Sequence, residues 1–383
     1  MSAGGPAFLP YGRQEVDEGD VAAVAAALRE DLITQGPAVE RFERAFAEHV
    51  GARHAVAFSS GTAALHGAAH AVGVGPGDRC VTAPITFAAS MNCGVYCGGV
   101  PAFADVDPAT WCLDPHAAAA VEDARMIVPV SFAGLPADLE PLRATGARIV
   151  EDAAHALGAL RDGRPVGGPG GADVTCFSLH PVKAMTTGEG GMATTEDDDL
   201  AERLRTFRTH GIRRGAATRP GEHDGAWYYE QQELGFNYRI TDFQCALGLR
   251  QLERLEGWVL RRNALAEQYR EMLADEAERV ALPPAAPAGS RHAHHLFVIH
   301  LAGGAPVRRR LFDGLRAAGI GVQVHYIPLH RMPYYRDTWG VPQDAFPHAD
   351  AYYAGALSLP MFPGLAEDDV VRVVENVRRL LDE

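Results

Sequence analysis

The stretch CFSLHPVKAMTTGEGGMATT, residues 176–195, decides the fold and contains the only lysine of the chain, Lys183. Its apolar start predicts a strand ending near Ser178, a turn through Pro181 presents Lys183, and GEGG leads into another strand. Of the 35 lysine and arginine residues, one is lysine and 34 are arginine. Arginine cannot serve where an uncharged amine must attack a carbonyl, because guanidinium stays protonated. Lys183 is therefore the first candidate for a reactive amine, against the alternative of a leftover surface residue.

Outward from this stretch, short apolar runs alternate with alanine-rich helical runs. The runs expected to form strands are HAVAFSS (54–60), RCVTAP (79–84), PAFADV (101–106), RMIVPVSF (125–132), ARIVEDA (147–153) and VTCFSL (174–179). Most of the segments between them have helical composition, as in GTAALHGAAHAVG (61–73). This alternation predicts an α/β fold with a mostly parallel mixed sheet between helices.

The second half of the chain predicts a different organisation. Apolar residues three and four apart predict a long helix from about Thr241 to Asp275, and PPAAPAG (283–289) has the composition of a linker. Beyond it, HHLFVIHL, RRRLFDGLRAAG and GVQVHYI predict a smaller α+β domain. We expect residues 1–255 to form an N-terminal arm and a large domain, and residues 256–383 a small C-terminal domain entered through the long helix.

The composition narrows the classes of protein. With 47% apolar and 22% charged residues, the chain has the profile of a soluble globular protein. Six cysteines without a CxxC pair predict reduced thiols and a cytoplasmic location rather than a disulfide framework. No apolar run has membrane-spanning length, and the first residues lack the pattern of a secretion signal. The net charge of −14 disfavours nucleic acids and anionic membranes as partners.

The run RHAHH (291–295) is a second pattern to weigh, because histidines bind metals. It precedes an apolar strand, and no set of cysteines or carboxylates accompanies it. We therefore expect these histidines at the surface or at a sheet edge, and no metal site.

The motif EDAAHALGA (151–159) places Asp152 at the end of a predicted strand. Pyridoxal phosphate acts as an electron sink only while its ring nitrogen is protonated, which requires a carboxylate partner. Asp152 is placed for that role, and His155 is a candidate for contact with the ring oxygen. Asp152 could instead cap a helix N-terminus, and one carboxylate can do both.

The motif SSGTAALHGA (59–68) puts small residues and a hydroxyl at the start of a predicted helix. Exposed amides and the helix dipole make such an N-terminus an anion site, so Gly61 and Thr62 would hold a phosphate that Ser178 also reaches. A simple helix cap explains this motif equally well when it is taken alone. Together with Asp152 and Lys183, however, it completes the set of groups that a pyridoxal-phosphate enzyme needs.

These motifs resemble the DegT/DnrJ/EryC1/StrS family of sugar-nucleotide aminotransferases over essentially the whole chain. The resemblance is carried by SSGTAALH, PITFAA, EDAAHALGA, FSLHPVK, TTGEGG, RTHGI, LGFNYRITDFQCALGLRQL and VQVHYIPLH. It implies the aspartate-aminotransferase (type I) fold and pyridoxal 5′-phosphate held as an aldimine on Lys183, with pyridoxamine phosphate during turnover. It also implies a homodimer with shared active sites.

The family's cofactor contacts carry over to matching positions of this chain, which are Gly61, Thr62, Phe87, Asp152, His155, Ser178, Lys183 and Asn237. The resemblance implies that Lys183 and Asp152 are catalytic, with Lys183 moving the proton between cofactor and substrate carbons. Phe87 would stack on the cofactor ring, and Asn237 would reach the phosphate in the neighbouring subunit. His155 stands where many relatives have glutamine.

Within the family, the branch that acts in pseudaminic acid biosynthesis resembles this chain most, in LPYGRQEV, LITQGP, PITFAAS, FSLHPVKAMTTGEGG, WYYEQQELGFNYR, VHYIPLHRMPYY and LSLPMFP. The likeness implies transfer of an amino group from L-glutamate to C4 of UDP-2-acetamido-2,6-dideoxy-β-L-arabino-hex-4-ulose. The candidates for contacts with the sugar nucleotide are Tyr11, Gln35, Gly36, Gln323, His325 and Tyr326. Ordinary packing is the alternative for Tyr11 and Tyr326.

Three other functions fit the same scaffold. An aminotransferase acting on another nucleotide sugar, such as a dTDP-keto sugar at C3 or C4, would share every catalytic residue. A sugar 3-dehydratase normally has histidine in place of the reactive lysine; Lys183 argues against it, although His180 lies close in the sequence. A catalytically silent binding or regulatory protein would be expected to have lost Lys183 or Asp152.

Overall fold

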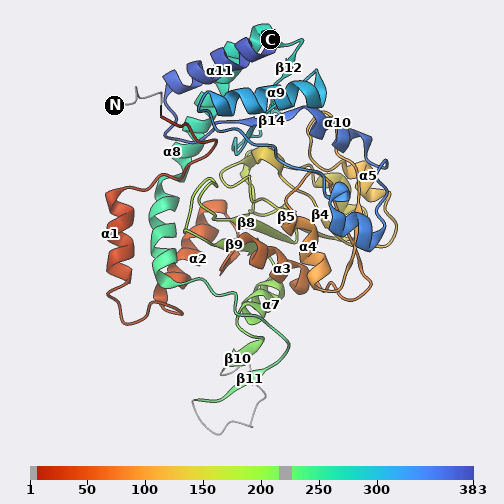
Figure 1. The fold of residues 1–383 in the computed structure, drawn as a ribbon. Coiled ribbons are helices and arrows are strands. Elements are labelled where there is room, and N and C mark those ends of the chain that lie inside the picture. The colour runs from red at the N-terminus through yellow and green to blue at the C-terminus, as the bar shows by residue number, and fades with distance from the viewer. Residues whose placement is uncertain (1–6, 215–226) are drawn as a thin grey trace.

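The computed structural model describes residues 7–214 and 227–383. Its central sheet is built from β1 (His54–Phe58), β2 (Arg79–Thr82), β3 (Val100–Phe103), β4 (Ala124–Val128), β5 (Arg148–Asp152), β8 (Val174–Ser178) and β9 (Gly191–Thr195). These strands lie in the order β1-β9-β8-β5-β4-β2-β3, and Figure 1 labels β9, β8, β5 and β4 among them. Only β9 is antiparallel to its neighbours, and the other pairs are parallel. The predicted α/β fold with a mostly parallel mixed sheet is confirmed.

Helices cover both faces of this sheet. The first face is covered by α3 (Gly61–Ala71), α4 (Ala89–Tyr96) and α7 (Asp198–Arg208), and the second by α2 (Pro37–Val50) and α8 (Asp242–Leu273). Strand β1 illustrates why both faces need a cover. Successive side chains of a strand point to opposite faces of the sheet. Val56 and Phe58 pack in the cluster that contains α3, whereas Ala55 and Ala57 pack against Phe42 of α2. Both faces of the sheet are thus buried, as near-continuously apolar strands require.

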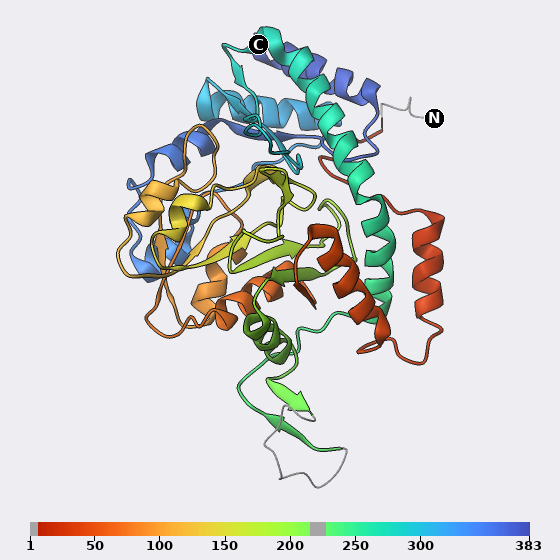
Figure 2. The same ribbon diagram turned by 180° about the vertical axis from the view of Figure 1, so that it is seen from behind.

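Helix α8 connects the two ends of the molecule (Figure 2). It spans 32 residues and starts with a capping box between Thr241 and Gln244. One end packs beside α2 and α1 (Glu18–Ala27), and its later turns reach the C-terminal sheet. The predicted helix from about Thr241 to Asp275 is confirmed, and the predicted domain boundary at residues 255/256 falls inside it. That boundary stays a prediction.

Asp242, in the first turn of α8, caps a distant helix. Its carboxylate accepts hydrogen bonds from the backbone N–H of Gly36 at 2.8 Å and of Ala38 at 2.9 Å. Gly36 is the N-cap residue of α2 and has no side chain to cap it. A Cβ atom at Gly36 would lie 2.6 Å from an oxygen of Asp242, so only glycine fits this contact.

The C-terminal part contains a small antiparallel sheet in which β13 (Phe297–Leu301) lies between β12 (Val280–Ala281) and β14 (Ala356–Leu359). Helices α9 (Gly304–Ala317) and α11 (Glu367–Asp382) pack on it and share its buried cluster. Leu9, from the start of the described chain, belongs to the same cluster.

The segment GVQVHYI (321–327), expected to extend the small domain, forms no continuous strand. Gly321 donates a hydrogen bond to the carbonyl of Leu9, whereas Gln323 pairs with Ser358 in an isolated bridge. Because its backbone is shared between two neighbours in this way, no ladder develops.

The remaining elements lie around this frame. They are α5 (Pro115–Ala119), α6 (Glu140–Arg143), α10 (Pro347–Gly355), β6 (Leu160–Arg161), β7 (Arg164–Pro165), β10 (Ile212–Arg214) and β11 (Tyr229–Gln231). The β10–β11 pair projects from the body of the molecule beyond α7 (Figure 1). Across the described ranges, no helix combines the length and the hydropathy needed to cross a bilayer.

Candidate active site

Four segments that follow parallel strands bring their side chains to one edge of the central sheet. Asp152 ends β5, Ser178 ends β8, Gly61 follows β1, and Phe87 follows β2. The carboxyl ends of such strands form the usual ligand crevice of an open α/β sheet. Here they border a cavity of roughly 420 Å³, which we call the active-site cavity. The predicted site residues that line it are Tyr11, Gly61, Thr62, Phe87, Asp152, His155, Ser178, Lys183, His325 and Tyr326.

Asp152 is buried, lines this cavity and is held by two donors. The hydroxyl of Ser90 donates to Oδ2 at 2.6 Å, and the backbone N–H of Ala154 donates to Oδ1 at 3.0 Å. Because Ser90 donates its proton to Asp152, the Thr86 hydroxyl 2.6 Å away must donate to Ser90. Burial raises the pKa of Asp152, and the hydrogen bonds of Ser90 and Ala154 oppose that shift. The carboxylate is therefore fixed in orientation and ready to pair with a cation.

Lys183 lines the same cavity, in the turn between β8 and β9. Its backbone N–H donates to the carbonyl of His180 at 2.9 Å, which closes this turn. Burial lowers the pKa of the Lys183 amine to about 8, while the charge of Asp152 opposes the shift. A substantial fraction of the amine is therefore uncharged near neutral pH, as nucleophilic and basic roles require.

The N-terminus of α3 faces the cavity through Ser60, Gly61 and Thr62. Ser60 caps the helix by accepting a hydrogen bond from the N–H of Ala63 at 3.1 Å. The first N–H groups of a helix have no partner within it, so they are available to an anion. A Cβ atom at Gly61 would lie 2.8 Å from Cβ of Ser178, so glycine lets this serine approach the helix end.

His155 and Tyr326 form a hydrogen-bonded pair that also lines the active-site cavity. His155 Nδ1 accepts from the backbone N–H of Ala133 at 3.3 Å, and Nε2 lies 3.1 Å from the Tyr326 hydroxyl. Burial lowers the pKa of His155 well below its ordinary value, so the ring is neutral. A neutral ring that accepts at Nδ1 carries its proton on Nε2, and it therefore donates to Tyr326.

His295 and His325 also line the active-site cavity, and the position of His295 differs from the one predicted for the run RHAHH. The expected surface or edge position of RHAHH is wrong, because His292, His294 and His295 are all buried. The following strand, β13, is the middle strand of its sheet, so the residues before it enter the interior. His295 lines the active-site cavity, with its ring centroid 5.0 Å from that of His155. His325 accompanies it, and burial lowers its pKa to about 3.

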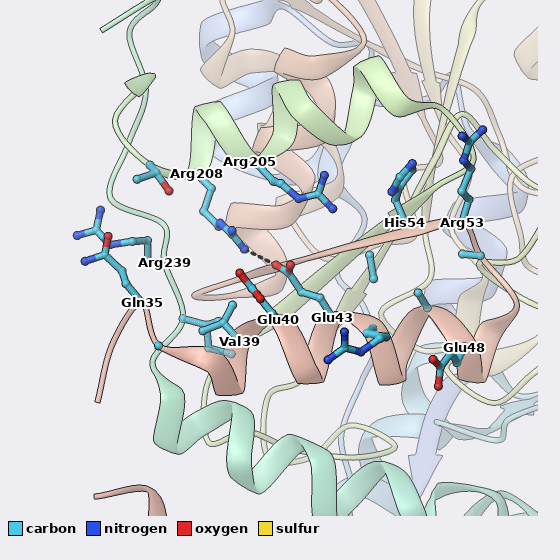
Figure 3. A pocket seen from close by; sticks show the side chains of 17 residues that line it. Gln35, Val39, Glu40, Glu43, Glu48, Arg53, His54, Arg205, Arg208 and Arg239 are labelled. Carbon is cyan, nitrogen blue, oxygen red and sulfur yellow. Dashed lines mark hydrogen bonds and ion pairs between the residues drawn. The ribbon is translucent and has the colours of Figure 1, made fainter. Parts of the chain in front are cut away.

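Four predicted site residues lie outside the active-site cavity: Gln35, Gly36, Asn237 and Gln323. Gln323 pairs with Ser358, and Asn237 is exposed and forms a bridge with Thr209. Gln35 and Gly36 line a second cavity of roughly 750 Å³, between α2, α7 and the segment before α8 (Figure 3). We call it the arginine-lined cavity, since Arg44, Arg53, Arg205, Arg208 and Arg239 border it.

Sequence reasoning missed three residues that shape the site. Thr86 and Ser90 both lie in the quoted motif PITFAAS, with Thr86 in the bend before α4 and Ser90 in the first turn of that helix. Because Thr86 lies outside the helix, helical spacing gave no signal for their hydrogen bond. His295 lay in a run interpreted as a surface segment, and no local signal marked it.

The groups present fit pyridoxal phosphate. An amine, a buried carboxylate with both oxygens oriented, and a glycine-fitted helix N-terminus border one cavity. Within the described residues, no group of three or more His, Cys, Asp or Glu side chains is arranged to hold a metal ion. The fold and this cavity together define a pyridoxal-phosphate-dependent enzyme of the type I fold.

Comparison with known proteins gives the family. The chain belongs to the DegT/DnrJ/EryC1/StrS aminotransferase family, whose model matches residues 14–378. The spore coat polysaccharide biosynthesis protein SpsC of Bacillus subtilis is 38% identical over 98% of this chain and 97% of its own. The PMP form of Spr1654 from Streptococcus pneumoniae superposes with a TM-score of 0.91 at 26% identity, covering 98% and 99% of the two chains. Spr1654 has also been solved in its PLP form.

A third similar protein is PseC of Helicobacter pylori, an aminotransferase involved in the biosynthesis of pseudoaminic acid. It matches with a TM-score of 0.90 at 26% identity, over 98% of this chain and 99% of PseC. The chain is thus an enzyme of the pyridoxal-phosphate-dependent sugar aminotransferases, which act on a sugar substrate and an amino donor.

Proposed function

We propose that this enzyme transfers an amino group from L-glutamate to C4 of UDP-2-acetamido-2,6-dideoxy-β-L-arabino-hex-4-ulose, a step of pseudaminic acid biosynthesis. The observation that carries the proposal is the convergence of two distant motifs on the active-site cavity. Tyr11 of LPYGRQEV and His325 of VHYIPLHRMPYY line it together, with ring centroids 5.5 Å apart. Both motifs belong to the set that distinguishes the pseudaminic acid branch. The likeness to PseC supports the same substrate class.

The cofactor, when bound, supplies a carbonyl for amine exchange and a ring that delocalises an electron pair. We assign its phosphate to the first turn of α3 with Ser178, and its ring nitrogen to Asp152. Phe87 would stack on the ring, and it is well placed to do so because its side chain lines the cavity.

Lys183 carries the proton transfers in this proposal. Its Nζ removes the proton from the glutamate carbon that bears the amino group, and later gives a proton to C4 of the sugar. The lowered pKa, about 8, supports this role because the same group must accept and release a proton near neutral pH. The expected kinetics are ping-pong, because 2-oxoglutarate, the product formed from glutamate, leaves before the keto sugar reacts.

A homodimer in the cytoplasm completes the proposal. Phe87 is 59% exposed in a single chain. Such exposure is unusual for a side chain that is expected to stack on a buried cofactor ring. Asn237 is also exposed. A second subunit over this face would cover both. The six cysteines are free thiols, which supports a reducing compartment.

Another nucleotide sugar is the second candidate substrate. The 38% identity to SpsC, a spore coat polysaccharide biosynthesis protein, supports a sugar for a surface polysaccharide. Such an enzyme would keep Lys183 and Asp152 and differ only around Tyr11 and His325.

The test is an assay of the purified holoenzyme with glutamate and a panel of UDP- and dTDP-linked 4-keto and 3-keto sugars. We expect a 4-amino product from the UDP-linked N-acetyl sugar, and borohydride should fix the cofactor to Lys183. Turnover of a dTDP-sugar alone would overturn the substrate assignment. A Lys183→Ala variant that still transaminates would overturn the assignment of the reactive amine, and dehydration of a keto sugar would identify the other reaction class.

A further inference from the structure

Glu151 is a buried carboxylate that lies outside the active-site cavity. It precedes Asp152 in β5, and successive side chains of a strand point to opposite faces of the sheet, so it faces away from the cavity that Asp152 lines. The Glu151 side chain is 0% exposed, and Arg161 and Ser131 donate to its Oε1, each at 2.5 Å. The Thr175 hydroxyl donates to Oε2 at 3.4 Å. Burial of a charge is costly without such partners, so the carboxylate and its donors hold one another in place.

The two donors to Oε1 close a loop of the chain, residues 131–137, which follows β4. Ser131, at the start of this loop, accepts a hydrogen bond from the backbone N–H of Ala137 at 3.0 Å. Arg161 Nε donates to the carbonyl of Ala137 at 3.0 Å. Glu151 therefore binds the start of the loop directly and its end through Ser131 and Arg161.

The middle of loop 131–137 has an unusual backbone. Ala133 has φ 54° and ψ 7°, a left-handed conformation that alanine rarely adopts. The next residue, Gly134, also has a positive φ, and a Cβ atom there would lie 2.8 Å from the backbone nitrogen of His294. A left-handed alanine persists only where the surrounding structure over-determines it, so the bonds at both ends of the loop help to hold Ala133.

This conformation directs one backbone group of the loop at the active site. The N–H of Ala133 donates to Nδ1 of His155 at 3.3 Å, which leaves the ring proton on Nε2, 3.1 Å from the Tyr326 hydroxyl. If Ala133 turned away, Nδ1 would lose its donor, and the ring would carry its proton on either nitrogen. In the second tautomer Tyr326 donates to His155 and has no proton left for the cavity.

We infer that Glu151 is a positioning residue for the aminotransferase reaction, acting through loop 131–137 on the tautomer of His155. By this route it keeps the Tyr326 hydroxyl a donor toward the substrate, although its own side chain faces the other side of the sheet. The inference rests on the proposed function only for the keto sugar that is used in the kinetic test.

The tautomer of His155 tests the inference without any substrate. Nitrogen NMR spectra of the holoenzyme with isotope-labelled histidine rings are recorded for wild type, Glu151→Gln and Ser131→Ala, and the His155 signals are assigned by their loss in His155→Gln. We expect the proton on Nε2 in wild type and a mixture of both tautomers in Glu151→Gln. Signals of His155 that stay as in wild type would overturn the inference.

Ser131→Ala decides the question if Glu151→Gln does not fold. This variant leaves the pair of Glu151 and Arg161 intact and removes only the hydroxyl that links Glu151 to the N–H of Ala137. We expect the same mixture of His155 tautomers, and an unchanged tautomer would count against the inference. Glu140→Gln is the matched control, since Glu140 is an exposed carboxylate of α6 and its loss should leave the His155 signals and the kinetics unchanged.

A double variant separates positioning from general damage to the fold. Glu151→Gln alone should lower kcat/KM for the keto sugar about 5- to 10-fold, because the Tyr326 donor is lost in part of the molecules. In a Tyr326→Phe background the same change should cost little more, since the group on which it acts is already absent. Losses that multiply fully would assign Glu151 a purely structural role and overturn the inference. Failure of the proposed function looks different, because wild type would then turn over no sugar of the panel while the His155 signals of Glu151→Gln still change.

Discussion

His155 Nε2 lies 3.1 Å from the hydroxyl oxygen of Tyr326, and the backbone N–H of Ala133 occupies the other ring nitrogen. The histidine therefore donates to the tyrosine, which leaves the tyrosine's own proton free to point into the cavity. Burial raises the pKa of Tyr326, so the hydroxyl keeps that proton across the working pH range. Tyr326 is thus a hydrogen-bond donor set up by His155, at a wall of the cavity that Lys183 also lines.

Replacing Tyr326 with phenylalanine should lower kcat/KM for the keto sugar by about 10- to 100-fold, because one donor to a reacting oxygen is lost. The absorbance of the bound cofactor should stay unchanged. His155→Leu should have a similar effect, and the two changes together should cost little more than either alone. Tyr334→Phe is a control at an exposed tyrosine. Fully additive losses in the double variant would contradict the coupling.

The pH dependence of Lys183 should show its lowered pKa directly. In cofactor-free protein, the uncharged fraction of this amine should rise through a midpoint near pH 8 instead of 10.5, so labelling by an acylating reagent should increase about five-fold from pH 7 to pH 8. Mass spectrometry of the peptide that contains residue 183 measures this rate, since no other lysine competes. Labelling that keeps rising up to pH 10.5 would contradict the burial of the amine.

The same shift affects stability with a defined sign. Between pH 8 and 10.5 the unfolded chain binds more protons at Lys183 than the folded chain does. The contribution of this group to the free energy of unfolding therefore increases as pH rises through that window. Urea unfolding of wild-type and Lys183→Met apo protein at pH 7.5 and 9.5 isolates the contribution of Lys183 to the free energy of unfolding. The variant should be more stable than wild type, and by a larger margin at pH 7.5.

Ser90→Ala should weaken the function of Asp152 without removing the carboxylate. The Ser90 hydrogen bond lowers the pKa of Asp152, so its loss should raise that pKa further and reduce pairing with the cofactor's ring nitrogen. We expect kcat to fall about ten-fold and the pH profile to shift upward on its acidic side. Thr86→Val, which removes only the donor to Ser90, should have a smaller effect. An unchanged acidic limb in Ser90→Ala would argue against this role.

Two glycines of α8 offer a matched test of packing. A Cβ atom at Gly248 would lie 2.6 Å from the ring of Phe42 in α2, whereas one at Gly257 would meet nothing within 4 Å. Gly248→Ala should therefore lower the free energy of unfolding by about 1–3 kcal/mol through overpacking. Gly257→Ala, in the same helix, should raise it by about 0.5–1 kcal/mol. Denaturant titration of both variants measures the difference, and equal shifts would contradict the close approach of α2 and α8.

The sequence predicted where the strands end, because each apolar run stops at the edge of the sheet that borders the ligand crevice. That pattern located Asp152 and Ser178, and the unique lysine located the turn between β8 and β9. The local pattern could not show that Ser90 bonds to Asp152, since the two residues are 62 positions apart. Strand order was equally hidden, which is why the residues before β13 were wrongly expected at the surface.

Gly36 illustrates a second limit. The resemblance suggested a substrate contact, and the structure shows its backbone N–H bound by Asp242. That partner belongs to a helix whose position follows from packing against α2 and not from any nearby residue. A helix cap supplied from a distant segment leaves no trace in the flanking sequence.

The hydrogen bond between Gly36 and Asp242 also sets an order of events during synthesis. Its partners are separated by 206 residues, so α2 leaves the ribosome about 10–40 s before the carboxylate that caps it. Throughout that interval the ring of Phe42, which ends up fully buried, has no α8 to cover it. The nascent chain therefore exposes an apolar helix face for many seconds, and its first-made helices are among the last parts to reach their native surroundings.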